Sequence, residues 1–240
     1  MKNYKILRSE DRGYASHGWL KSHHSFSFAN YHNPEWVHFG ALRVINDDVV
    51  MGGRGFGSHP HDNMEIISIP LSGDLAHKDS NGNEKVIKNG DIQVMSAGTG
   101  IIHSEYNANE DRDVNFLQIW VFPNERNITP HYQQKTINFD KSHNNFLTLL
   151  SPDRDAEESV WIHQNAWFSL ATIDANAAVQ YQKHDANNGT YIFILEGDAI
   201  VRDEKLNTKD AIMFDDLADF SVNTQNNPAK VLILEVPMNF

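Results

Sequence analysis

The sequence predicts an all-β protein built from two β-barrels in tandem, and three observations support this fold class. Short runs rich in Ile, Val, Phe and Trp recur along the 240 residues. Turn residues separate these runs, and no long stretch shows the 3.6-residue period of an amphipathic helix. The order of the runs is also repeated once along the chain. A chain of this length can form two domains of about 100–120 residues each.

Eight runs have the length and composition of β-strands. They cover residues 38–45, 65–71, 91–97, 115–122, 167–173, 191–197, 211–216 and 231–236. Glycine-containing turn signals such as Ser-Gly-Asp, Asn-Gly-Asp and Glu-Gly-Asp stand between them. This alternation of short strands and tight turns is typical of sandwiches and barrels.

A faint internal repeat divides the chain. Residues 66–79 align with 191–203, so that Gly73-Asp74 matches Gly197-Asp198. Two further pairs of segments follow in the same order, namely 90–95 with 209–214 and 117–123 with 231–237. Three matches in one order favour a duplicated barrel. We therefore expect a metal-binding N-terminal domain at 1–130 and a degenerate C-terminal domain at 131–240.

The overall composition excludes several classes of function. The formal net charge is −12, which disfavours direct binding to nucleic acid and leaves a protein partner compatible with the surface. The chain has no cysteine, so disulfides, thiolate ligands and cysteine nucleophiles are all excluded.

No segment resembles a signal peptide, and the longest apolar runs are far shorter than the ~20 residues of a membrane helix. The sequence predicts a cytoplasmic monomer with no membrane contact.

Two pairs of potential ligands stand at the spacing that places side chains on one face of a strand. His59 and His61 are two residues apart, and 42 residues further on His103 and Glu105 repeat this spacing. Residues i and i+2 of a strand point to the same side, roughly 6.6 Å apart along its axis. Two such pairs would supply three nitrogens and one oxygen, which suits a divalent first-row metal with open coordination positions.

A single His-x-His pair has a simpler interpretation, because such histidines are common on surfaces and in hydrogen-bonded core positions. The second pair and the glycines near it, Gly98 and Gly100, are what favour a metal site. His77, His131, His143 and His163 have no paired partner. His23 and His24 are adjacent and would point to opposite faces of a strand, so they are expected to have structural or solvent roles.

The residues around these pairs resemble a known family. The segment 52–65, GGRGFGSHPHDNME, is similar to the first cupin motif, and 90–107 resembles the second cupin motif in its pirin form. The matching positions are Gly53, His59, His61, Glu65, Ala97, Gly98, Gly100, His103, Ser104 and Glu105. Ser96 replaces the proline of the general motif, and Gly73 closes the first motif one residue late. Residues 11–34 also resemble the pirin N-terminal signature.

The resemblance implies a fold and a metal site. Pirins have two cupin domains, each a jelly-roll β-barrel, and hold one iron in the N-terminal barrel with three histidines and a glutamate. Carried over position by position, these ligands are His59, His61, His103 and Glu105, whereas Glu65 is expected to have a structural role. The resemblance favours Fe(II), but the same ligands accept Zn, Ni, Mn or Cu.

The C-terminal copy lacks this ligand set. At the offsets of the repeat, His59 and His61 correspond to Lys183 and Asp185, while His103 and Glu105 correspond to Val222 and Thr224. We therefore expect no metal in the second barrel.

The resemblance also implies an activity. Bacterial pirin-like proteins are associated with quercetin 2,3-dioxygenase activity, in which O2 opens the central ring of a flavonol and carbon monoxide is released. Glu105 is then the candidate catalytic base, and a small flavonol-like aromatic compound and O2 are the expected substrates. The alternative is an iron-binding, redox-sensing regulator that acts through protein contacts.

Overall fold

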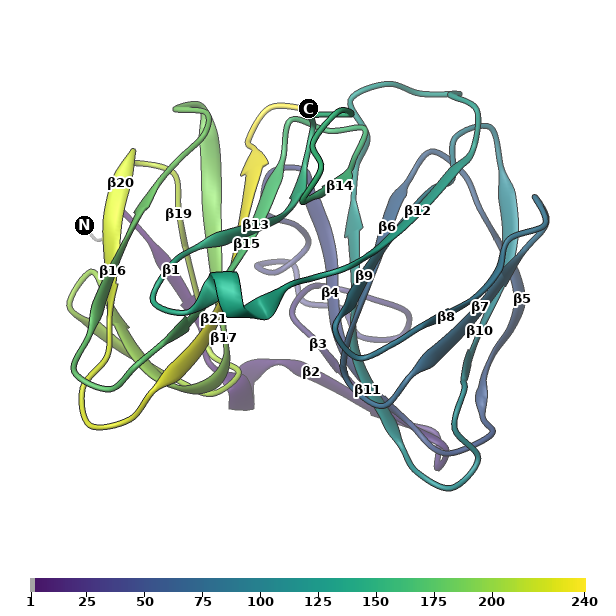
Figure 1. Cartoon of the computed structure of the whole chain (residues 1–240), viewed down its shortest axis with the longest axis horizontal. Helices are drawn as coiled ribbons and strands as arrows, with labels where there is room; N and C mark the ends of the chain where they lie inside the picture. The colour runs from purple at the N-terminus through teal and green to yellow at the C-terminus, as the bar shows by residue number, and fades with distance from the viewer. Residues whose placement is uncertain (1–2) are drawn as a thin grey trace. The chain divides into compact units, whose positions relative to one another are not determined.

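The computed structural model describes residues 3–240 and consists almost entirely of β-strands, which confirms the predicted fold class. The chain forms two compact units (Figure 1). The N-terminal unit contains Gly13–Ile137, Val160–Gln164 and Phe240. The C-terminal unit contains the described residues up to Arg12, together with Asn138–Ser159 and Asn165–Asn239.

Two sheets form the N-terminal unit. The larger sheet has the order β12-β9-β6-β11-β4-β3-β2, and the smaller has the order β5-β10-β7-β8. The strands of the larger sheet are β2 (Gly13–Ser16), β3 (Leu20–His24), β4 (Leu42–Val50), β6 (Glu65–Ser72), β9 (Asp91–Ser96), β11 (Val114–Val121) and β12 (His131–Thr136). Those of the smaller sheet are β5 (Gly55–His61), β7 (Leu75–Asp79), β8 (Glu84–Ile87) and β10 (Ile101–Asn107). A short β14 (Val160–Trp161) also belongs to this unit.

Alternating burial explains why the smaller sheet forms one wall of a barrel. In β7 and β10 the inward side chains are buried, and most of the side chains between them are exposed or half-buried. The central strands β6 and β9 of the larger sheet are buried on both faces over most of their length. The hydrophobic interior includes Leu75, Ile87, Val114 and Phe116. The polar residues that interrupt this interior lie around the histidines described below.

The C-terminal unit repeats the arrangement of the first. Its strands are β1 (Lys5–Leu7), β13 (Leu147–Ser151), β15 (Trp167–Ile173), β16 (Ala178–Gln182), β17 (Asn188–Val201), β18 (Glu204–Asn207), β19 (Ala211–Phe214), β20 (Asp219–Asn223) and β21 (Ala229–Pro237). The order β19-β17-β21-β15 corresponds to β9-β6-β11-β4 of the N-terminal unit. Likewise, β16 pairs with β20 as β5 pairs with β10. One-turn 3-10 helices lie at Ser9–Asp11 and Phe139–Ser142.

The compact units differ from the expected division at residues 130 and 131. Strand β1 pairs with β19, so the beginning of the chain packs in the C-terminal unit. Strand β12 pairs with β9 and extends the N-terminal unit to Ile137. The two strands occupy equivalent edges, because β1 adds to β19, β12 adds to β9, and β19 and β9 correspond in the two repeats.

Among the described residues, no helix is long and apolar enough to cross a membrane.

The strand expected at 38–45 begins and ends later than the sequence suggests. Strand β4 runs from Leu42 to Val50 and includes the polar Asn46, Asp47 and Asp48, all of them buried. Side chains of neighbouring strands satisfy these groups: Asn115 Nδ2 donates to Asp47 Oδ1 over 2.7 Å, and Ser22 Oγ donates to Asp48. A buried carboxylate that accepts a hydrogen bond is tolerated inside a strand. In the sequence alone, however, a run of polar residues indicates the end of a strand.

Candidate metal centre

Strands β5 and β10 bring the predicted ligand pairs together. The two strands are antiparallel, and their register places His103 opposite His59 and Ile101 opposite His61. Gly55 permits this close approach, since a Cβ atom there would lie 2.3 Å from the carbonyl oxygen of Glu105. The pairing shifts register between His103 and Glu105, at a β-bulge or similar irregularity. Bulges of this kind often redirect a side chain near a functional site.

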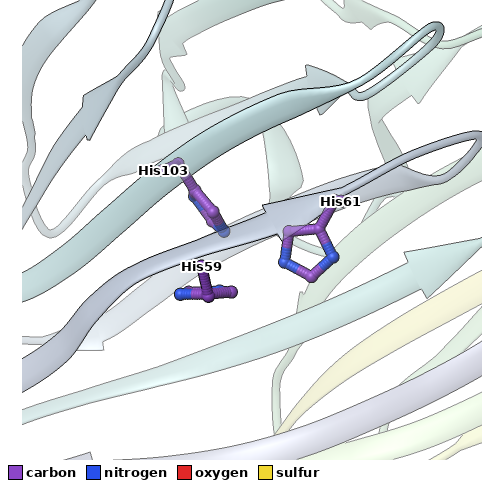
Figure 2. Close-up of side chains that lie close together, drawn as sticks. All are labelled: His59, His61 and His103. Carbon is purple, nitrogen blue, oxygen red and sulfur yellow. The ribbon is translucent and has the colours of Figure 1, made fainter.

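Three imidazole rings form one cluster at this pairing. The ring centroids of His59 and His103 are 4.5 Å apart, and His61 lies 4.9 Å from each of them. Their nitrogen ligand atoms all lie within 4.8 Å of one another. Figure 2 shows the three side chains converging, two from one strand and one from its neighbour. His59 and His61 are half-buried and His103 is buried, so the cluster is accessible from one side.

The hydrogen bonds of these rings leave nitrogen lone pairs free for a metal. His59 Nδ1 lies 2.7 Å from the carbonyl oxygen of Gly57, so it is the protonated nitrogen and Nε2 carries the lone pair. Both ring nitrogens of His103 are buried without a hydrogen-bond partner, although the residue is only 2% exposed. Such orphaned buried nitrogens fit a divalent metal, which would supply the missing interaction.

The electrostatic surroundings keep the His61 and His103 rings neutral. Burial, reinforced by the neighbouring His59, lowers the pKa of His61 to about 4. The same two causes, with His61 and His77 contributing further, lower the pKa of His103 to about 2. Neutral imidazoles are the form that binds metals, so these two rings do not need to lose a proton at neutral pH.

Glu105 follows His103 on the inward face of β10, but its carboxylate has other neighbours. Ser68 Oγ donates to Oε1 over 3.0 Å, and Gln118 Nε2 donates to Oε2 over 2.6 Å. Complete burial raises the pKa of Glu105 to about 7, against the effect of the hydrogen bond from Ser68. Its ligand oxygen lies within 4.8 Å of His77 and His103, in a second group. The structure thus gathers His59, His61 and His103 in one group, and it groups the Glu105 carboxylate with His103 and His77.

A cavity of about 120 Å³ adjoins the cluster within the N-terminal unit. His59 and Glu105 are among its lining residues, and Phe28, Phe56 and Trp120 contribute aromatic side chains to it. Its other lining residues are Ala15, His17, Leu20, Ser22, His24, Ala29, Asn46, Asp48 and Gln118. Aromatic walls beside a few converging polar groups are typical of small-molecule sites.

Glu65 has the structural surroundings expected for it. The side chain is completely buried, and its Oε2 accepts hydrogen bonds from Ser96 Oγ at 2.7 Å and from the backbone nitrogen of His163 at 3.2 Å. Burial raises its pKa to about 7. Glu65 therefore links β6 to β9 and to the segment 160–164. Ser96, the departure from the general cupin motif, is its partner in this link.

The interpretation of His77 as a histidine without a partner was wrong. His77 is buried on β7, its Nε2 lies 3.1 Å from Asp79 Oδ2, and its ring lies 5.4 Å from that of His103. The His-x-Asp spacing is the i, i+2 pattern that also marks the other ligand pairs, and it could have identified this residue. The adjacent His23 and His24 do point to opposite faces, with His24 buried against Asn46.

The positions of the C-terminal unit that correspond to the ligands have other contacts. Lys183 Nζ donates to the carbonyl oxygens of Ala186 and Asn188 over 3.1 and 2.5 Å. Val222 belongs to the hydrophobic core of that unit, and Thr224 Oγ1 donates to a backbone carbonyl oxygen. At the fourth position, Asp185 Oδ2 accepts a hydrogen bond from Asn165 Nδ2 at 2.7 Å, so packing and hydrogen bonding account for all four positions. Both groups of potential metal ligands found among the described residues lie in the N-terminal unit.

Comparison with known proteins decides the family. Residues 7–121 match the Pirin family model, and residues 148–236 match the model of the quercetinase C-terminal cupin domain. A protein of Escherichia coli K12 named quercetin 2,3-dioxygenase is 40% identical over 234 residues, which cover 97% of this chain and 98% of that protein. The chain belongs to the pirin family.

Solved structures agree with this assignment. The crystal structure of YhhW from E. coli, 36% identical, superposes with a TM-score of 0.92 and covers 99% of both chains. A second structure describes the bacterial pirin YhhW in complex with nickel(II), with a TM-score of 0.90 and coverage of 98% of this chain and 99% of that one. Like those pirins, this one has the two-cupin fold. The group of His59, His61 and His103, with Glu105 near it, is a candidate metal-binding site in this pirin.

Proposed function

We propose that this pirin is a metal-dependent dioxygenase that opens the central ring of quercetin or a related flavonol with O2 and releases carbon monoxide. The observation that carries the proposal is the cluster of His59, His61 and His103, open on one side and placed beside a cavity with aromatic walls. Relatives named quercetin 2,3-dioxygenase support the same reaction class.

His59, His61 and His103 would hold the metal, and Glu105 would complete the set by turning from Ser68 and Gln118. A bound divalent metal would act as a Lewis acid toward the adjacent hydroxyl and carbonyl groups of the substrate. It would also give O2 access to the reaction. Three neutral imidazoles leave the ion its positive charge, which favours binding of a deprotonated enol. The ligand set accepts iron, nickel, manganese, zinc or copper, and iron is the metal we propose.

Glu105 is the base that we assign to the 3-hydroxyl proton of the flavonol. Its pKa, raised by burial to about 7, lies where a carboxylate can accept a proton at neutral pH. Ser68 and Gln118 each donate one hydrogen bond to the carboxylate where it lines the cavity, so Glu105 would be held there by these donors when it loosens from the metal and acts as base. The proton would move to one of these carboxylate oxygens.

The cavity limits how a flavonol could bind. Its volume of about 120 Å³ is below the roughly 300–1,000 Å³ of pockets that enclose drug-sized ligands. We therefore propose that only the chelating edge of the substrate enters. Phe28 and Trp120, whose rings lie 5.4 Å apart, would contact the flat face of that edge.

Oxygen uptake tests the proposal. Fe(II)-loaded protein is supplied with quercetin, and both O2 consumption and carbon monoxide release are measured beside His59→Ala. His143→Ala, a substitution of an exposed histidine outside the site, is the matched control. We expect the wild type and His143→Ala to consume O2 with release of carbon monoxide, and His59→Ala to lose at least 100-fold. Equal rates in all three would reflect autoxidation of quercetin and would favour the redox-sensing regulator.

A further inference from the structure

The C-terminal unit has a cavity of its own, and it is larger than the cavity beside the histidine cluster. Its volume is about 520 Å³, against about 120 Å³ for the cavity of the N-terminal unit. Strand β13, the loop 153–159, Trp167 at the start of β15 and His184 contribute to its lining. All of them belong to the C-terminal unit. A cavity of this volume lies within the roughly 300–1,000 Å³ of pockets that enclose small molecules.

The place of this cavity in its barrel corresponds to that of the N-terminal cavity. The strand order β21-β15-β13 repeats the order β11-β4-β3, and β16 corresponds to β5. The N-terminal cavity has lining residues on β3, β4 and β5. The C-terminal cavity has them on β13 and β15 and at His184, shortly after β16. The second barrel thus lacks the ligand set but has an opening at the equivalent strands.

Aromatic rings form part of the wall of the C-terminal cavity. The rings of Trp167 and His184 stack, with centroids 4.9 Å apart and planes 4° from parallel. The buried Glu235 fixes His184, because its Oε2 accepts hydrogen bonds from the backbone nitrogen at 3.0 Å and from Nδ1 at 3.1 Å. Phe146 adds a third ring, which packs edge-on against Tyr181 with centroids 5.2 Å apart. Such rings offer contact to flat groups, and the face of a tryptophan also attracts cations.

Carboxylates provide a second part of the wall. Asp153, Glu157 and Glu158 line the cavity, and no lysine or arginine among the described residues does so. Glu158 forms an ion pair with Lys141, and Arg154 stands in the same loop. With both of these cations counted, the carboxylates remain in excess. Acidic residues alone are common on protein surfaces, but their position beside stacked rings suits an organic cation.

A buried pair of serines adds an unsatisfied hydrogen-bond donor to the same cavity. Ser151 and Ser159 both line it, each is 5% exposed, and their Oγ atoms lie 2.7 Å apart. One hydroxyl donates its proton to the other, and neither makes a further hydrogen bond with the described residues. The second hydroxyl proton therefore has no acceptor in the described chain. Because buried hydroxyl groups normally find partners, this proton indicates a ligand that brings an acceptor oxygen.

We propose that this cavity binds a small aromatic amine, in its protonated form, that also carries a hydroxyl group. The ammonium group would lie near the carboxylates of Asp153 and Glu157, and the ring would contact Trp167. The hydroxyl oxygen of the ligand would accept the hydrogen bond that the serine pair offers. The site is separate from the histidine cluster, and its occupation depends neither on a metal nor on dioxygenase activity.

Three probe molecules separate these contributions. Tyramine has the ammonium group, the ring and the hydroxyl, whereas phenethylamine lacks the hydroxyl. The third probe, 3-(4-hydroxyphenyl)propionate, keeps the ring and the hydroxyl but has a carboxylate in place of the ammonium group. Calorimetric titration of the full-length, metal-loaded protein at low salt measures the three affinities. We expect tyramine to bind about 5-fold more tightly than phenethylamine and at least about 10-fold more tightly than the propionate.

Charge variants locate this binding in the C-terminal cavity. The double variant Asp153→Asn/Glu157→Gln replaces two exposed carboxylates without disturbing the core, and it should weaken tyramine binding by about 10-fold. Glu84→Gln, which removes an exposed carboxylate of β8 that pairs with Lys78, is the matched control and should leave the affinity unchanged.

Two further variants test the serine pair and the ring. Ser151→Ala/Ser159→Ala should abolish the preference for tyramine over phenethylamine, and Trp167→Leu should weaken both amines by about 10-fold. Circular dichroism verifies that each variant is folded. The proposal is overturned if tyramine does not bind, if the propionate binds as tightly as tyramine, or if Asp153→Asn/Glu157→Gln binds tyramine like the wild type.

Discussion

His59 and His103 face each other across the pairing of β5 with β10, with ring centroids 4.5 Å apart. They come from segments separated by more than 40 residues, and two orphaned nitrogens on His103 point to the interaction that is missing between them. This relationship, more than either His-x-His spacing or family membership, is the physical basis for a metal centre. His103 also occurs in both groups of potential ligands found among the described residues.

The first prediction concerns His103 itself. His103→Ala removes one of the three clustered imidazole ligands, so we expect the purified protein to retain less than a tenth of the wild-type metal. Elemental analysis after metal loading and dialysis measures this. The fold is expected to persist, because neither ring nitrogen of His103 makes a hydrogen bond. Metal content equal to that of the wild type would refute the assignment.

The second prediction uses two glycines of β5. A Cβ at Gly55 would lie 2.3 Å from the carbonyl oxygen of Glu105, whereas a Cβ at Gly57 would meet nothing within 4 Å. Gly55→Ala should push β5 away from β10 and so displace the strand that carries His59 and His61. We expect metal affinity to weaken by about 10-fold or more, as it does when residues that position metal ligands are changed. Calorimetric titration measures the affinity, and Gly57→Ala is the matched control. Equal affinities in the two variants would show that strand spacing does not set the site.

The third prediction is a pH dependence of stability at Glu65. Its pKa is raised from 4.5 to about 7 by burial, so the folded protein holds a proton that the unfolded chain releases above pH 4.5. The stabilisation is complete below that pH and is lost as pH rises toward 7. Glu65→Gln remains neutral throughout.

The free energy of unfolding of Glu65→Gln, relative to the wild type, should therefore increase between pH 4.5 and 7. The change is on the order of 3 kcal/mol. Urea unfolding at a series of pH values measures it. A difference between the two proteins that stays constant across this range would mean that Glu65 has the same pKa in both states.

The fourth prediction concerns the beginning of the chain. Leu7 on β1 is 1% exposed and pairs with Ala211 of β19 in the C-terminal unit. Leu7→Ala should lower the free energy of unfolding by about 2–5 kcal/mol, as other buried leucine truncations do. Lys5→Ala, on the same strand but exposed, is the control. Hydrogen exchange should rise in the C-terminal unit. A loss below about 0.5 kcal/mol would contradict this packing.

Local patterns in the sequence predicted much of the site. The alternation of a strand places His103 and Glu105 on the inward face of β10, and both are buried there. The pairing of β5 with β10 cannot be derived from either segment, because register depends on contacts between strands distant in sequence. The orientation of the Glu105 carboxylate toward Ser68 and Gln118 likewise depends on β6 and β11.

The fold was predicted at the level of strands and repeats, but not at the level of edges. Strands β1 and β12 are short, polar or half-buried, and no periodicity distinguishes them from loops. Each is defined by the edge to which it adds, which is a tertiary property. His77 is different, because its i, i+2 spacing to Asp79 is visible in the sequence and is the spacing of the ligand pairs.

The most direct test of the central claim is anomalous diffraction from a crystal of the metal-loaded protein, recorded at the absorption edge of the metal. We expect an ion about 2.0–2.2 Å from one nitrogen each of His59, His61 and His103, with an oxygen of Glu105 turned toward it. The absence of any anomalous peak within bonding distance of His59, His61 and His103 would contradict the account.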